Sequence, residues 1–211
     1  MQLTKEERCK EFIQCLDKNI AHDRIKKIVV FYDAGNENKS DAFLNKIKSK
    51  DIDIVYKKGR LTYKEAFTYA NERFPFSDII VANADIYFNE TLNKLDTVDL
   101  NQNFLCLTRW NMQKNGKLKI FYQPHGSHYS QDAWIFKTPL KINFRCSFKM
   151  GLKHCDSSLN YHLKNSQLNI SNPCLDIQAC HLHISNCRND GFSVPNNHTE
   201  GIGWSYLMPK L

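Results

Sequence analysis

The sequence predicts a single α/β domain over residues 1–211, built on a mostly parallel central sheet flanked by helices. Two observations lead to this prediction. The runs 27–32 and 78–83 are apolar without alternation, which is typical of strands buried on both faces. Segments with helical spacing lie between the strands, and this order favours parallel pairing. No repeat or low-complexity linker divides the chain.

The first half, about residues 25–110, is the regular part and is preceded by one helix. Thr4 and the acidic residues after it predict the capped start of that amphipathic helix. The strand at 27–32, a helix at 40–48 and a short strand at 52–56 would then make a βαβ unit. Thr62 is the expected cap of a helix over 63–73, which strands at 78–83 and 104–107 follow.

The second half, about residues 111–211, is less regular, and we expect a mixed arrangement there. Strands are predicted at 133–136 and 177–183, and a helix at about 156–164. In α/β sheets, ligands gather at the carboxyl ends of the strands, so polar residues at those ends are the candidates for a site.

Composition narrows the function only slightly. Lys and Arg number 29 against 22 Asp and Glu, and the resulting charge of +7 favours anionic partners without identifying them. No apolar run approaches the ~20 residues of a membrane span, and the N-terminus is charged where a signal peptide would be apolar. We therefore expect no membrane span and a cytoplasmic location. The eight cysteines form no CxxC pair, which predicts free thiols.

Asp85 is the first candidate for chemistry. The apolar strand at 78–83 runs directly into Asn83 and Asp85, which places a carboxylate at the end of a strand. A hard divalent cation on a nucleotide takes one or two carboxylates and completes its shell with phosphate and water. The alternative is that Asp85 only caps the following turn.

Two further carboxylates stand beside predicted elements. Asp132 precedes an apolar strand, and Asp156 opens a predicted helix, where the helix dipole favours an ionised carboxylate. Ordinary helix capping by itself accounts for Asp156, so its functional role depends on support from outside these residues.

Two histidines share one face of a predicted strand. His181 and His183 are two residues apart, and side chains alternate with period two along a strand. The pair is suitable for a metal, although histidines on a polar strand face are also common at surfaces.

Three arginines each follow a predicted element: Arg60, Arg109 and Arg188. Guanidinium groups bind phosphate in a bidentate manner, so these residues are candidates for a diphosphate site. Surface charge or a structural ion pair is the alternative for each of them.

Taken together, these segments resemble the GT-A (Rossmann-like) nucleotide-sugar glycosyltransferases. The mark of that class is a strand that ends in an Asp-x-Asp motif holding a divalent cation on the donor diphosphate. Here the motif is Asn83-Ala84-Asp85, with an amide in place of the first acid. The chain is most similar to small glycosyltransferase domains of bacteria and large DNA viruses, of the chlorella-virus type. Six short segments carry this likeness in order, beginning at Arg60, Asn83, Thr108, Gln131, Gly151 and His181.

The resemblance implies a donor-binding half before about residue 110 and an acceptor-side half after it. It implies a nucleotide-sugar donor, with UDP preferred, and a glycan or glycoprotein acceptor, in a chain that can belong to a larger multidomain protein. Mn²⁺ or Mg²⁺ would be held by Asp85 with His183 or His181. Asp156 would act as catalytic base, with Asp132 as the competing candidate. The donor would contact a wider set of residues: Tyr32, Asp33, Arg60, Asn83, Asp85, Arg109 and Arg188.

Two other classes of function stay open. A nucleotide-sugar binding module without turnover is conceivable because Asn83 replaces an acid. A metal-dependent nuclease or phosphodiesterase could use the three Asp and the His pair around two metals. The basic residues are dispersed rather than set in a stripe, so we expect no nucleic-acid partner.

Overall fold

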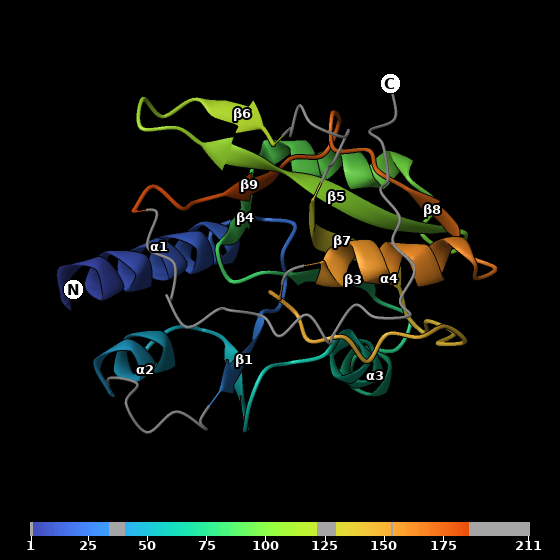
Figure 1. The fold of residues 1–211 in the computed structure, drawn as a ribbon, viewed down its shortest axis with the longest axis horizontal. Helices are drawn as coiled ribbons and strands as arrows, with labels where there is room; N and C mark the ends of the chain where they lie inside the picture. The colour runs from blue at the N-terminus through green and yellow to red at the C-terminus, as the bar shows by residue number, and fades with distance from the viewer. Residues whose placement is uncertain (1, 34–40, 122–129, 153, 186–211) are drawn as a thin grey trace.

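A computed structural model of the chain describes residues 2–33, 41–121, 130–152 and 154–185 (Figure 1). The first half contains α1 (Gln2–Ile20), β1 (Val29–Asp33), α2 (Asp41–Lys48), β2 (Asp53–Lys57), α3 (Tyr63–Arg73), β3 (Asp78–Ala82), β4 (Ile86–Phe88), the 3₁₀ helix η1 (Glu90–Thr97) and β5 (Asn103–Met112). The second half contains β6 (Leu118–Ile120), β7 (Gln131–Lys137), α4 (Cys155–Lys164), β8 (Asn169–Ser171) and β9 (Ala179–His181).

The central sheet is mixed, and the prediction of a mostly parallel sheet is wrong. Seven strands form it, in the order β3-β7-β5-β9-β4, with β6 and β8 also paired to β5. Of the six strand pairings described within this sheet, four are antiparallel, and the other two are the parallel pairings of β8 and β9 with β5. The apolar runs correctly indicated strands, but the prediction that both are buried on both faces is wrong: β1 lies in a two-stranded sheet, β3 lies at a sheet edge, and no residue of either strand is fully buried. An apolar run also does not fix strand direction. Strand β7 from the second half inserts antiparallel between β3 and β5.

The predicted βαβ unit is confirmed, in a different place from the one expected. Strands β1 and β2 pair in parallel around α2, but they form a separate two-stranded sheet instead of the start of the central one. In Figure 1 this unit lies beneath the large sheet. The half that was predicted to be a continuous nucleotide-binding sheet is therefore divided between two sheets.

Helices cover the two faces of the large sheet. On one face, Trp134 and Phe136 of β7 pack against α3 and α4, while on the other Ala133 and Ile135 pack with Leu92 of η1. This alternation follows from the period of two along a strand. Both faces of the sheet are therefore packed with apolar side chains.

Helix α1 closes the β4 edge of the sheet. The side-chain amide of Asn19 donates to the carbonyl of Ile86 at 2.9 Å and accepts from the amide of Phe88 at 3.0 Å, so it satisfies backbone groups of an edge strand. This contact fixes the helix beside the segment that carries Asp85. Helix α1 begins at Gln2, so the expected cap at Thr4 is wrong.

The other predicted elements are close to the observed ones. Helix α3 spans the predicted residues, and Thr62 and Glu65 form its capping box. Strand β9 ends at His181, earlier than predicted, while α4 begins at Cys155. Among the described residues, no helix is both long and apolar enough to cross a membrane.

Candidate metal centre and adjoining pocket

Strand register brings the candidate metal ligands together. Strand β4 pairs antiparallel with β9 so that Ile86 lies opposite His181, and the amide of Leu182 donates to the carbonyl of Asp85 at 2.9 Å. The residue before β4 therefore lies beside the end of β9, although 96 positions separate Asp85 from His181. One ligand atom from each of Asp85, His181 and His183 lies within 4.8 Å of the other two.

These side chains are suitable for a divalent metal ion. One carboxylate oxygen and two imidazole nitrogens converge, with rings of His181 and His183 at 5.6 Å between centroids and nearly perpendicular. His181 is buried, His183 is partly buried, and only 14% of the Asp85 side chain is exposed. A set of three protein ligands leaves coordination positions for substrate oxygens or water.

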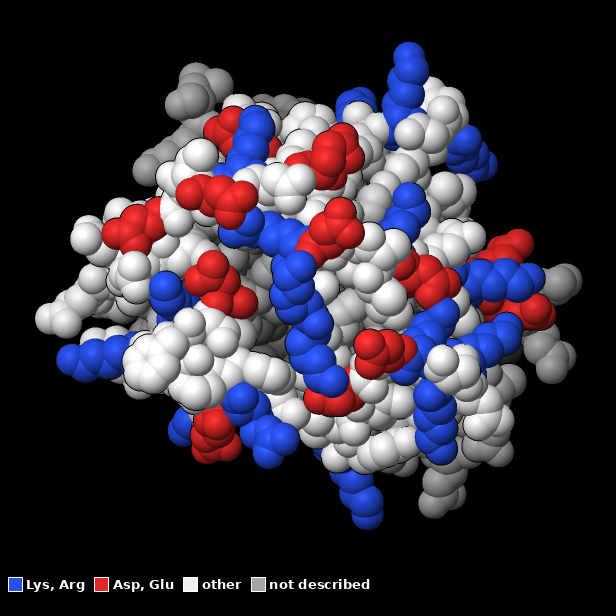
Figure 2. Space-filling model, turned by 180° about the vertical axis from the view of Figure 1, so that it is seen from behind, with Lys and Arg blue, Asp and Glu red and all other residues white. Residues whose placement is uncertain are grey.

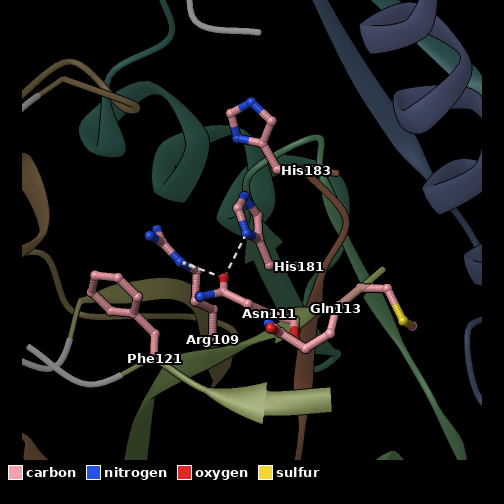
Figure 3. Close-up of a pocket in the computed structure, with 7 residues that line it drawn as sticks. Arg109, Asn111, Gln113, Phe121, His181 and His183 are labelled. Atoms are coloured by element: carbon pink, nitrogen blue, oxygen red, sulfur yellow. Dashed lines mark hydrogen bonds between the residues drawn. The ribbon is translucent and has the colours of Figure 1, made fainter. Parts of the chain in front are cut away.

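A hydrogen-bond network fixes which nitrogen of His181 faces Asp85. The Nε–H of Arg109 donates to Asn111 Oδ1 at 3.2 Å, which identifies that atom as the amide oxygen. The same oxygen lies 2.8 Å from His181 Nδ1, so Nδ1 carries a proton and donates (Figure 3).

The remaining nitrogen, His181 Nε2, lies 3.1 Å from Asp85 Oδ2. In a neutral ring, Nε2 would direct a lone pair at a carboxylate oxygen, which is repulsive. The contact is attractive only when a proton or a metal cation lies between the two atoms. A histidine that ligates a metal through one nitrogen and donates from the other is the usual arrangement in metal sites.

Arg8 of α1 completes the surroundings of Asp85. Its guanidinium donates to Asp85 Oδ2, and also to the carbonyl of Leu182 at 3.0 Å and to Glu11 Oε2 at 2.9 Å. Burial would raise the pKa of Asp85, but the contacts with His181 and Arg8 outweigh it and hold that pKa well below its usual range. Asp85 is therefore a carboxylate that stays ionised.

A pocket of about 270 Å³ opens beside two of the candidate ligands, His181 and His183. Figure 3 shows Arg109 and Phe121 on one side of it and the two imidazoles on the other. The Arg109 guanidinium stacks on the Phe121 ring at 4.1 Å. The described residues that line the pocket are Arg109, Asn111, Met112, Gln113, Phe121, His181 and His183. Arg109 thus reaches the predicted site, whereas Asp33, Tyr32 and Arg60 are not among these lining residues.

A second group of carboxylates, Asp132 and Asp156, lies near the Arg109 guanidinium, which contacts Asp132 directly. The guanidinium Nη1 donates to both oxygens of Asp132, at 3.2 and 3.3 Å, and Ser130 Oγ donates to Oδ2 at 3.2 Å. Asp156, at the start of α4, accepts from the amide of Gln131 at 3.1 Å. Burial and the neighbouring Asp132 carboxylate raise the pKa of Asp156. The expectation that the helix dipole would favour its ionised form is wrong, because burial and like charge dominate.

Asn83 directly follows β3 and contacts Asp132. Its side-chain amide donates to Asp132 Oδ1 at 2.8 Å, and its backbone amide donates to the Asp132 carbonyl at 3.1 Å. An Asp at this position would place two carboxylates within hydrogen-bond distance. The amide therefore joins the segment between β3 and β4, which contains Asp85, to the strand that carries Asp132 without like-charge repulsion.

Three of the remaining candidates lie elsewhere. Tyr32 and Asp33 are at the end of β1, where the Tyr32 ring packs on Tyr56 and Asp33 accepts from the amide of Gly59 at 2.9 Å. Arg60 Nη1 lies 3.4 Å from the carbonyl of Met150, a residue of the segment before α4. Burial lowers the pKa of the Arg60 guanidinium. Arg188 falls outside the described residues.

Sequence reasoning missed Arg8, Glu11 and Asn111. Asn111 could have been found, since it lies two residues after Arg109 on the same strand and so shares its face. Arg8 gives no such signal, because 77 positions separate it from Asp85 and only the docking of α1 joins them.

Comparisons with known proteins add little to this geometry. No protein-family model matches the chain, and a search of curated proteins gave no match. One solved structure that is similar in shape is described as the crystal structure of HddC from Yersinia pseudotuberculosis. It matches 67% of this chain and 73% of its own, at 13% identity and a TM-score of 0.36, and a likeness at that level supports no conclusion about function.

Proposed function

We propose that this protein is a metal-dependent glycosyltransferase that moves a sugar from a nucleoside diphosphate, UDP being preferred, to an acceptor hydroxyl on a glycan. The observation that carries the proposal is the convergence of Asp85, His181 and His183, because the two histidines also line a pocket that contains Arg109. A divalent cation beside a guanidinium suits the diphosphate of a sugar donor.

Each part of the pocket has a role in this chemistry. A bound Mn²⁺ or Mg²⁺ would offset the negative charge that grows on the departing diphosphate. Arg109 faces the same space, so its guanidinium would supply a second positive group. The two imidazoles favour Mn²⁺ over Mg²⁺, because Mg²⁺ takes oxygen ligands almost exclusively.

Asp156 is the better candidate for the catalytic base, the group that removes the proton from the hydroxyl of the glycan acceptor. Burial and Asp132 raise its pKa, and a carboxylate with a raised pKa binds a proton more strongly. Asp132 already accepts from Arg109, Asn83 and Ser130, which occupies both of its oxygens. We assign Asp132 to positioning Arg109 instead.

The nuclease alternative is less well supported. A two-metal site needs several carboxylates around the metals, whereas the ligand cluster among the described residues has one. On the face shown in Figure 2, Lys and Arg are interspersed with Asp and Glu instead of forming a basic stripe.

A donor panel tests the proposal directly. Thermal unfolding would be followed with UDP-, GDP- and dTDP-sugars, with and without Mn²⁺, and release of the nucleoside diphosphate would be measured in parallel. We expect one donor to raise the melting temperature only when Mn²⁺ is present, with slow release of its diphosphate. Donor binding without any release, with acceptors tested, would favour a binding module, and no binding of any donor would exclude both.

A further inference from the structure

The side chain of Arg8 contacts one of the three candidate metal ligands, Asp85. Its guanidinium donates to Asp85 Oδ2, the same oxygen that lies 3.1 Å from His181 Nε2. Both charged side chains are mostly buried, with 15% of Arg8 and 14% of Asp85 exposed, so solvent screens their interaction only weakly. In this structure a protein cation therefore neutralises the one carboxylate of the cluster.

We infer that Arg8 is a built-in counter-ion that competes with a divalent cation for Asp85, and so sets the affinity of the site for metal. The inference rests on the cation site of the proposed function. It follows from one shared atom, because the oxygen nearest the imidazole nitrogen is also the one that Arg8 binds. Like charges also repel at this range, so a dication is disfavoured while the guanidinium stays in contact.

Arg8 can release Asp85 without becoming an unpaired buried charge. Its Nη1 is held by Glu11 Oε2 at 2.9 Å and by the carbonyl of Leu182 at 3.0 Å. Both of these acceptors bind Nη1, whereas Asp85 binds Nη2. Breaking a buried ion pair is costly mainly when one partner is left without compensation, and here the guanidinium keeps Glu11.

Glu11 is the acidic partner that holds the counter-ion Arg8. It accepts from the amide of Ser185 at 2.7 Å and from Ser185 Oγ at 2.9 Å, so it also holds the segment that follows His183. The negative charge of Glu11 offsets that of Arg8. Removing this charge should leave Arg8 more strongly attached to Asp85 and make the site less favourable for a dication.

The test measures Mn²⁺ binding to the full chain by calorimetry, without any nucleotide. Arg8→Gln should bind Mn²⁺ about 10-fold more tightly than the unmodified protein, while Arg8→Lys, which keeps the charge, should stay within about 3-fold of it. Glu11→Gln should bind Mn²⁺ several-fold more weakly. Arg24→Gln, which breaks an ion pair with Asp96 on the exposed surface, is the matched control and should change nothing.

Thermal unfolding gives an independent readout. In chelator, Arg8→Gln should melt at a lower temperature than the unmodified protein, because Asp85 loses its partner, and saturating Mn²⁺ should shrink or reverse that difference. A purely structural Arg8 would instead leave the variant less stable in both conditions and its Mn²⁺ binding equal or weaker, which overturns the inference. If Arg8→Gln does not fold, unchanged or tighter Mn²⁺ binding by Glu11→Gln overturns it.

The outcomes also separate this inference from the proposed function. Tighter Mn²⁺ binding by Arg8→Gln without transfer from any nucleotide sugar would uphold the inference and reject the glycosyltransferase. Mn²⁺ binding by neither protein would reject both.

Discussion

Two carboxylate centres lie close together in this molecule, and opposite surroundings act on them. Asp85 faces an imidazole and a guanidinium, which hold its pKa low in spite of burial. Asp156 faces the carboxylate of Asp132, and burial adds to that repulsion to raise its pKa. The network His181–Asn111–Arg109–Asp132 connects the two centres. An aspartate is thus suited to hold a cation at Asp85 and to accept a proton at Asp156, because the surroundings of the two differ.

The largest effect should follow from neutralising Asp85, the carboxylate whose pKa is lowered. Asp85→Asn removes the only charged ligand of the described cluster, so we expect Mn²⁺ affinity to fall by on the order of 10²-fold or more, and metal-stimulated transfer to be lost with it. Calorimetry and a transfer assay measure the two effects. Asp96→Asn, at an exposed position, is the control. Full activity of Asp85→Asn in chelator would show that the centre is not the site.

Substitution of Asp156, the carboxylate whose pKa is raised, should have a different effect. Asp156→Asn keeps the shape of the side chain and removes its basicity, so we expect kcat to fall by about 10²- to 10⁴-fold while donor affinity is retained. Asp132→Asn, in contrast, deprives Arg109 of its partner and should alter donor affinity first. Near-normal turnover in Asp156→Asn, together with a low kcat in Asp132→Asn, would reverse the two assignments.

The link between the centres should have an intermediate effect. Asn111→Ala removes the acceptor that fixes the His181 ring, so we expect Mn²⁺ affinity to fall by about 10- to 100-fold with the fold intact. Gln113→Ala changes the same pocket wall without touching that bond and serves as its control. Equal affinities for the two variants would mean that the orientation of His181 does not depend on Asn111.

The smallest effect concerns stability and its dependence on pH. Because the pKa of Asp156 is raised in the folded state, its ionisation destabilises the fold as pH rises through that pKa. Asp156→Asn should therefore be more stable than the unmodified protein at pH 8, by on the order of 1 kcal/mol. The difference should disappear below about pH 4, where the carboxyl is protonated in both the folded and unfolded states. Urea denaturation in chelator across this range checks the sign, and a variant that is less stable at pH 8 would contradict it.

The sequence by itself determined the local elements and several members of the site. Thr62 predicted the start of α3, and the spacing of His181 and His183 placed both imidazoles on one side. The apolar strand before Asn83 was predicted correctly, and Asp85 lies in the turn that joins it to β4. These features depend on near neighbours along the chain, where side-chain periodicity and capping act.

Only the tertiary structure decided the strand directions and the partners of each charged group. A strand buried on both faces has the same apolar pattern whether its neighbours are parallel or antiparallel, so the insertion of β7 next to β3 left no local signal. Arg8 meets Asp85 because α1 docks against β4, and Asp156 meets Asp132 because α4 packs beside β7. The pKa of a carboxyl depends on such through-space neighbours and on burial, which the order of residues does not contain.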